Sequence, residues 1–166
     1  MKGIIIYNGR YGATQQYATW LAEELKMSSI KSDEATPDIL AMYDTVIVGG
    51  SIYVGQLVIN KWLKQHSELL SKKKLFLFVV SGGTTNDELL QKQVLNKNLD
   101  PLLRDMVKVF FLPGRCLKSR LSWKDRIVLK MGAWLEKDPQ KKMVMENGFD
   151  NMDKKALDPM IDAIKR

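Results

Sequence analysis

Residues 3–14 read GIIIYNGRYGAT, and this stretch decides the fold that we expect. Its first part, GIIIY, is a short apolar and mostly β-branched run, which is typical of a strand buried on both faces. The glycines that follow favour a tight turn, and apolar residues at helical spacing predict a helix from about Ala13 to Met27. A buried strand that leads through a short turn into a helix is the opening unit of an α/β fold.

The rest of the chain repeats this alternation. We expect further strands at Ile30–Asp33, Thr45–Gly49, Leu75–Val80 and Val107–Leu112. We expect helices near Leu57–Leu70, near Asp87–Asn96, directly after Asp100-Pro101 and at Met152–Ile164. Strands that are apolar throughout indicate a parallel sheet covered on both faces, and right-handed crossovers favour the strand order 2-1-3-4-5. The sequence therefore predicts an α/β, doubly wound, five-stranded parallel sheet in one domain over residues 1–166.

Two rare residue types narrow the kinds of site that this chain can form. The single cysteine, Cys116, excludes an internal disulfide and any multi-cysteine metal site. The single histidine, His66, excludes a zinc site built from several imidazoles, so we predict no metal site. Residues 1–7 lack the long apolar region of a signal peptide, and we expect a cytoplasmic protein.

The strand order also predicts where a ligand binds. Ligands of doubly wound sheets lie at the carboxyl ends of the strands, where the order reverses. Three loops reach this edge, at residues 8–14, 50–56 and 81–87. In the first loop, glycines allow backbone N–H groups to converge at a helix N-terminus, which favours a phosphate. Thr14 can add a hydroxyl to such a site, and Arg10 can add a counter-charge.

The three loops supply the candidate ligand-binding residues. Those of the first loop are Gly9, Arg10, Tyr11, Gly12, Ala13 and Thr14. The common nucleotide loops GxxxxGK(S/T) and GxGxxG are absent here, and a tight turn without a ligand fits these residues equally well. The second loop favours a ligand, because a planar heterocycle can stack on Tyr53. The residues expected around such a ring are Ser51, Ile52, Tyr53, Val54, Gly55 and Gln56, together with Ser81, Gly82, Gly83 and Thr84 of the third loop.

These loops resemble those of the flavodoxin-like FMN-binding family, over most of residues 1–112 and the last helix. The family's phosphate loop, T/S-x-T-G-x-T, falls on residues 9–14. Gly12 and Thr14 match it, whereas Gly9 and Tyr11 stand where the family has hydroxyl residues. The third loop lacks an aromatic residue to cover the second flavin face. The resemblance implies that FMN is the cofactor and that the flavin carries the redox chemistry without a catalytic side chain.

Within this family the chain resembles the menaquinone-dependent protoporphyrinogen dehydrogenases. It has their R-Y/D-G-x-T loop at residues 10–14, their G-x-S-I-x-x-G loop at residues 49–55 and a W-x-D-R element at residues 123–126. This implies an FMN-dependent oxidoreductase that passes electrons from a porphyrinogen-like or other donor to a membrane quinone. One alternative is a simple flavodoxin-type electron carrier that docks to a redox partner protein, although such carriers are typically acidic. The other is a flavin-free binding module of the same fold.

The positive charge of the chain is concentrated in one segment. The chain has 26 basic and 19 acidic residues, which gives +7, and residues 115–142 alone hold nine basic and three acidic residues, which gives +6. We expect this basic insertion to contain a helix from Trp123 to Lys137, with a capping box at Ser122 and Asp125. Tryptophans on one apolar arc, with basic residues on its flank, are typical of a helix that lies on anionic lipid.

The predicted membrane or partner surface of this helix consists of Trp123, Lys124, Arg126, Lys130, Trp134 and Lys137. The protein is then expected to lie peripherally on the inner face of the membrane. Two alternatives stay open: the apolar arc packs on its own domain, or it pairs with a partner subunit. Nucleic acid is not expected, because no recognition fold accompanies the basic residues. We expect residues 138–142 to be a solvated linker back to the domain.

Overall fold

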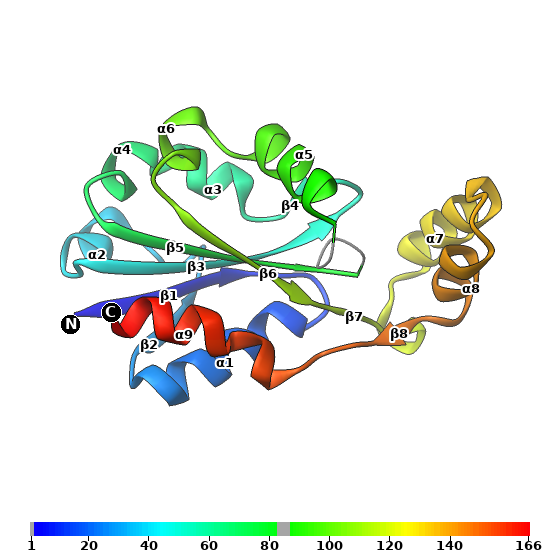
Figure 1. The fold of residues 1–166 in the computed structure, drawn as a ribbon, viewed down its shortest axis with the longest axis horizontal. Helices are drawn as coiled ribbons and strands as arrows, with labels where there is room; N and C mark the ends of the chain where they lie inside the picture. Colours follow the sequence, from blue (N-terminus) through cyan, green and yellow to red (C-terminus); the bar gives the residue numbers. More distant parts are fainter. Residues whose placement is uncertain (1, 83–86) are drawn as a thin grey trace.

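Five long parallel strands form the centre of the computed structural model, which describes residues 2–82 and 87–166. They are β1 (Gly3–Asn8), β2 (Ser28–Lys31), β3 (Thr45–Tyr53), β5 (Lys74–Ser81) and β6 (Lys108–Pro113). The order is β2-β1-β3-β5-β6, and the short strand β4 (Gln56–Leu57) pairs antiparallel with β3. The predicted α/β class and the order 2-1-3-4-5 of the long strands are therefore confirmed (Figure 1).

Helices cover both faces of the sheet, as Figure 1 shows. One face carries α1 (Ala13–Leu25) and α9 (Asp158–Lys165), which follows the short helix η2 (Lys154–Leu157). The other face carries α2 (Pro37–Ala41), α3 (Asn60–Gln65), α4 (Ser67–Leu70), α5 (Glu88–Asn98) and α6 (Pro101–Arg104). Ile4 and Ile6 pack on this second face, whereas Ile5 between them packs on the first. Because both faces are covered, the strands are apolar at successive positions.

The region after β3 differs from the expected loop and single long helix. β3 continues to Tyr53, so residues 50–53 belong to a strand and not to the predicted loop, and two short helices, α3 and α4, stand where one helix was expected. The chain then reverses at Val54 and Gly55, which both have positive φ, and β4 pairs back with β3. The buried side chain of Asn98 in α5 fixes this hairpin, because it accepts a hydrogen bond from the Leu57 N–H (2.8 Å) and donates one to the Gly55 carbonyl (3.2 Å).

The basic insertion forms a helical hairpin that projects beyond the carboxyl edge of the sheet (Figure 1). It comprises β7 (Arg115–Cys116), the short helix η1 (Lys118–Arg120), α7 (Trp123–Leu135), α8 (Pro139–Asn147) and β8 (Phe149–Asp150). At its base β7 pairs antiparallel with β8, and α7 packs along α8. We call α7 and α8 together the α7–α8 hairpin.

Two expectations for this insertion have different outcomes. The Ser122 half of the capping box is confirmed, because Ser122 Oγ accepts a hydrogen bond from the Asp125 N–H at 3.2 Å. The return bond is not formed, because the Ser122 N–H donates to the Tyr11 hydroxyl at 3.4 Å. The linker expected at residues 138–142 is wrong, because α8 begins at Pro139. The Asp138 carboxylate accepts a hydrogen bond from the Gln140 N–H at 2.9 Å and caps that helix. The expected end of the insertion at residue 142 thus lies inside α8.

Candidate functional site

The first loop is a tight turn between β1 and α1 that contains a buried hydroxyl without a partner. Gly12 has a left-handed φ of 85°, and α1 begins at the next residue, so the turn meets the unpaired N–H groups of a helix N-terminus. Thr14 is 1% exposed, and its Oγ1 has no hydrogen-bond partner. Buried polar groups are almost always paired, and leaving one unpaired costs free energy. The loop therefore favours a bound anion.

Thr14 also explains why the chain has glycine at position 9. A Cβ on Gly9 would lie 2.5 Å from Thr14 Oγ1 and 2.7 Å from Thr14 Cβ. No side chain fits at position 9 unless Thr14 moves. The first position of the phosphate-loop motif therefore has no hydroxyl because Thr14 lies too close to leave room for a side chain at Gly9. Thr14 itself carries the hydroxyl of the last motif position.

Tyr53, the predicted stacking residue, lies in a cluster that joins three segments of the chain. Asp125 of α7 is 4% exposed, and its carboxylate accepts hydrogen bonds from the hydroxyls of Tyr11 and Tyr53. Arg10 forms an ion pair with the same carboxylate at 3.1 Å, and its guanidinium carbon lies 4.0 Å from the centre of the Tyr53 ring. The insertion is therefore attached to the candidate site through one carboxylate. The sequence indicated Asp125 as a capping residue and as part of the W-x-D-R element, but not as a partner of the two loops.

The strand register explains why the first and second loops meet. β1 and β3 are neighbours, and Asn8, the last residue of β1, pairs with Gly50, so the first loop leaves the sheet beside the part of β3 that continues to Tyr53. Ser51 and Ile52 are half-buried in β3, whereas Val54 and its neighbours at the hairpin tip are exposed. Arg10 pairs with a carboxylate here, and its predicted role as the counter-charge of a phosphate stays a prediction.

The third loop follows β5, and an aromatic side chain reaches it from the insertion. Ser81 is buried at the end of β5, and Gly82 follows it. The predicted residues Gly83 and Thr84 lie outside the described residues. A Cβ on Gly82 would lie 2.4 Å from Cζ of Phe149, so the ring of this β8 residue packs directly on the loop. No pattern in the sequence indicated this contact, because Phe149 lies far along the chain.

Two titratable side chains near the base of the insertion have shifted pKa values. Burial raises the pKa of the Cys116 thiol, and the positive charge of Lys118 opposes this shift. A raised pKa disfavours the thiolate, so Cys116 is not an activated nucleophile. Burial also raises the pKa of Tyr17, whose hydroxyl donates to the Pro113 carbonyl (2.7 Å) and accepts from the Asp153 N–H (3.2 Å). These two bonds tie α1 to the chain segments on both sides of the insertion.

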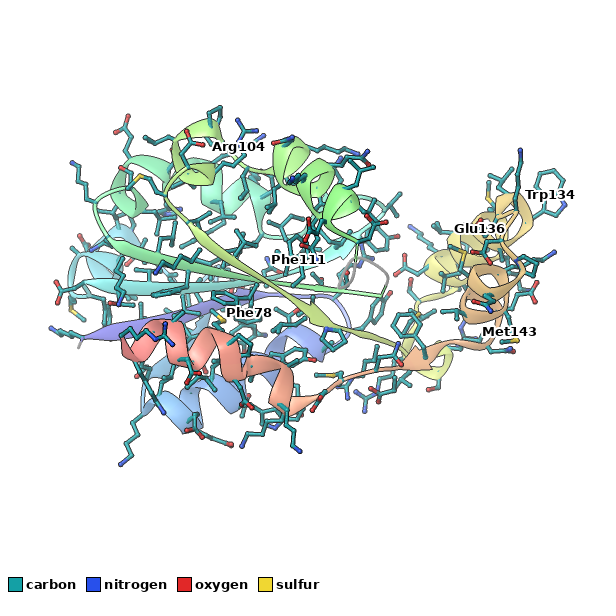
Figure 2. The ribbon with its side chains drawn as sticks, viewed as in Figure 1. Phe78, Arg104, Phe111, Trp134, Glu136 and Met143 are labelled. Atoms are coloured by element: carbon teal, nitrogen blue, oxygen red, sulfur yellow. The ribbon has the colours of Figure 1, made fainter. Side chains whose placement is uncertain are left out.

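The α7–α8 hairpin exposes a set of large apolar side chains. They are Trp123, Ile127, Val128, Met131, Trp134 and Leu135 on α7 and Met143 and Val144 on α8. Trp134 is 81% exposed, and Figure 2 shows it at the outer end of the hairpin, pointing away from the rest of the molecule. The apolar arc of α7 therefore does not pack on the sheet and its helices. No helix among residues 2–82 and 87–166 is long and apolar enough to cross a membrane.

The basic residues predicted for this surface are exposed as well, but they do not share one environment. Lys124 on α7 and Lys137, which lies beyond the end of α7 at Leu135, are exposed. Arg126 and Lys130 line a cleft of about 480 Å³ between η1, α7 and α8, whose apolar wall includes Leu129. Among the described residues, none of those predicted in the three loops lines this cleft.

Comparison with known proteins identifies the family of this chain. The family model of the flavodoxin domain matches residues 4–142, a span that includes α7. This chain belongs to the flavodoxin domain family. The matched span indicates that the family model extends through the first helix of the insertion.

Individual relatives of this flavodoxin domain are distant. An uncharacterized protein of Methanocaldococcus jannaschii is 30% identical over 100 residues, which are 58% of this chain. The match spans 65% of that protein, slightly less than two thirds of its length. Protoporphyrinogen IX dehydrogenase (quinone) of Escherichia coli strain K12 is 26% identical over 145 residues, 79% of this chain and 78% of that protein. Among solved structures, the Trp repressor binding protein of Bacillus subtilis has a TM-score of 0.52 at 16% identity and covers 82% of this chain and 100% of its own. This last likeness shows a shared fold.

Proposed function

We propose that this flavodoxin domain binds FMN and acts as an FMN-dependent oxidoreductase. The observation that carries the proposal is the buried Thr14 hydroxyl, which has no hydrogen-bond partner and lies in the first turn of α1. FMN ends in a phosphate, and phosphate oxygens accept hydrogen bonds from hydroxyls and from the N–H groups of a helix N-terminus. The residues of this loop therefore fit the cofactor.

We expect Tyr53 to offer the stacking surface for the flavin ring. Its ring already carries a flat cation, the Arg10 guanidinium, at 4.0 Å, and a flavin on the same ring face replaces that contact. Bound FMN supplies hydride or single-electron transfer. The part of the protein is to hold the phosphate at Thr14, to orient the ring at Tyr53 and to shield the site with the insertion that Asp125 holds in place.

We further propose that the electrons pass from a porphyrinogen-like donor to a quinone, with the protein lying peripherally on the inner face of a membrane. The distant Escherichia coli relative, named as a quinone-linked dehydrogenase, supports the acceptor. The exposed apolar face of the α7–α8 hairpin and its lysines support the membrane, because interfacial helices combine these features. Each basic residue near an anionic membrane surface contributes about 1 kcal/mol of attraction.

FMN titration of the purified chain tests the cofactor, with flavin fluorescence and the melting temperature as readouts. We expect FMN to bind and to raise the melting temperature. Thr14→Val should weaken FMN binding about tenfold or more, because it removes a hydroxyl that bonds to a charged acceptor. Thr19→Val is the matched control, since its hydroxyl bonds to the Gln15 carbonyl on the exposed side of the same helix. A chain that neither takes up FMN nor gains thermal stability from it would contradict the proposed FMN binding and favour a flavin-free binding module.

The electron acceptor is tested separately on the FMN-loaded chain. A porphyrinogen donor is offered with a quinone, and donor oxidation is followed by the appearance of porphyrin fluorescence. Turnover that needs the quinone supports the dehydrogenase. An FMN-loaded chain that reduces no quinone with this donor favours the simple flavodoxin-type carrier and a redox partner protein.

A further inference from the structure

Two arginines from the base of the insertion converge on the first loop. A Cβ placed on Gly12 would lie 3.4 Å from Nη2 of Arg115 and 3.9 Å from Nη1 of Arg120. Arg115 belongs to β7, and Arg120 ends η1, so both are far from the loop in sequence. The space beside the left-handed turn at Gly12 is therefore bordered by two guanidinium groups.

Neither guanidinium has a partner within the described part of the chain. The ion pairs found there join Arg10 to Asp125 and Lys165 to Glu24. Nε of Arg115 is buried and forms no hydrogen bond. Two like charges next to each other repel, and a buried donor without an acceptor is unfavourable. An anion between these groups removes both costs.

The unpaired hydroxyl of Thr14 lies in the same loop and points to the same kind of ligand. Three kinds of donor thus meet at this turn: the arginine side chains, the N–H groups at the start of α1 and the Thr14 hydroxyl. Guanidinium groups bind phosphate through paired N–H donors, which makes arginine well suited to this position.

We propose that Arg115 and Arg120 bind the phosphate of FMN. They take over the role of the hydroxyl that the loop lacks at Gly9 and of the hydroxyl at Tyr11, which donates to Asp125 instead. The inference rests on the proposed FMN binding and adds the residues that hold the phosphate. The first motif position has no hydroxyl and the hydroxyl at the third donates to Asp125, whereas the insertion supplies charged donors at the same turn. The base of the insertion is then part of the cofactor site, and part of the +6 charge, from nine basic and three acidic residues, serves the cofactor and not the outer surface.

A phosphate-binding role of the two arginines and a purely structural role predict different affinities for riboflavin. Riboflavin has the same ring as FMN but no phosphate, so it cannot use a phosphate-binding residue. Arg115 and Arg120 should therefore strengthen the binding of FMN and leave that of riboflavin unchanged. FMN binding should also weaken as salt is added, because the attraction between the phosphate and the guanidinium groups is screened.

The experiment measures the affinity of the full chain and of Arg115→Gln and Arg120→Gln for FMN and for riboflavin, by quenching of flavin fluorescence. We expect each substitution to weaken FMN binding about tenfold to a hundredfold, the range for hydrogen bonds to a charged group, and to leave riboflavin binding within about twofold. Arg104→Gln is the matched control, because Arg104 lies on α6, away from the insertion, as Figure 2 shows, and bonds to the Asn96 side chain. It should change neither affinity.

The outcomes distinguish this inference from the proposed function. A parent chain that binds neither flavin contradicts both. A parent chain that binds FMN, with variants that bind it equally well or that lose FMN and riboflavin alike, overturns the role of the arginines and leaves the proposed function standing. If Arg115→Gln does not fold, the role of Arg115 is tested by the FMN affinity of Arg115→Lys and by the salt dependence of FMN binding to the parent chain. FMN affinity that is as insensitive to salt as riboflavin affinity overturns the inference.

Discussion

The sheet and the α7–α8 hairpin use apolar residues in opposite ways. In the sheet, Ile5, Ile47 and Phe76 are fully buried, with helices on both faces. On the hairpin, Trp123 is 69% and Trp134 is 81% exposed. Burial of a large apolar side chain contributes about 1.5–3 kcal/mol to folding, and this contribution is missing where the side chain stays in water. Apolar side chains thus build a core where another layer covers them and form an exposed apolar face where no described residue covers them.

The attachment of the hairpin differs from the cohesion of the sheet as well. Within the described residues, α7 buries only Asp125 and Ala133. Asp125 holds the hairpin on Tyr11, Tyr53 and Arg10 by polar contacts, whereas the strands are held by packing. Polar contacts of this kind contribute less than a packed core does. Substitutions should therefore have their largest effects on stability in the sheet and their smallest on the hairpin surface.

The largest expected effect comes from Gly49→Ala in β3. The added methyl group would lie 2.0 Å from Cζ of Phe78, which is fully buried and has no room to move. Overpacking of this kind should lower the free energy of unfolding by about 3 kcal/mol or more. Urea unfolding measures the change. The matched control is Gly132→Ala in α7, where the nearest atom lies 3.7 Å away and a better helix former should stabilise by about 0.5–1 kcal/mol. A loss of stability that is equal at both positions would contradict the contrast between the packed sheet and the exposed hairpin.

An intermediate effect is expected from Asp125→Asn, which weakens the attachment itself. The variant loses the ion pair with Arg10 and part of its capacity to accept bonds from the two tyrosines. Because the Arg10 side chain is 42% exposed and can be hydrated, we expect a loss of only about 1–2 kcal/mol. Limited proteolysis should show faster cleavage in residues 115–150, with the sheet intact. Asp162→Asn, an exposed change on α9, is the control and should cleave like the parent chain. An unchanged cleavage rate in Asp125→Asn would show that other contacts hold the hairpin.

The contrast between the packed sheet and the hairpin, which is held by contacts between distant segments, also explains which features the sequence could predict. The strands were predictable because burial on both faces makes them apolar at successive positions, a local signal. The start of α8 also had a local signal, because Asp138-Pro139 begins a helix in the same way as Asp100-Pro101. In each case the Asp carboxylate accepts a hydrogen bond from the backbone N–H two residues later, at 2.9 Å. The linker prediction failed because the surrounding lysines look like a solvated segment.

Contacts between distant segments carried no such local signal. β3 reads as ending at Gly49, and its continuation to Tyr53 depends on Asn98 in α5, which bonds to the hairpin beyond it. Asp125 fits a capping position, and nothing in its neighbourhood indicates that the carboxylate reaches Tyr53. Candidate loops were therefore predictable from the topology, whereas the residues that the insertion adds to them were not.

The smallest effect on stability, and the largest on membrane binding, is expected from Trp134→Ser. The side chain is 81% exposed, so its loss should change the free energy of unfolding by less than about 0.5 kcal/mol. A tryptophan that inserts into the lipid interface contributes directly to membrane affinity. Co-sedimentation with anionic vesicles should therefore fall severalfold, and further in the double variant with Trp123→Ser.

Leu89→Ser is the control that ties this result to the hairpin. Leu89 is as exposed as Trp123, at 69%, but it lies on α5. If exposed apolar area alone caused vesicle binding, the two sites would behave alike, whereas an interfacial hairpin requires that only the α7 changes reduce it. Added salt should weaken the binding of the parent chain, because salt screens the attraction of exposed lysines such as Lys124 on α7 and Lys137 just beyond it to anionic lipid. Vesicle binding that survives both tryptophan changes and high salt would contradict the membrane role of the hairpin.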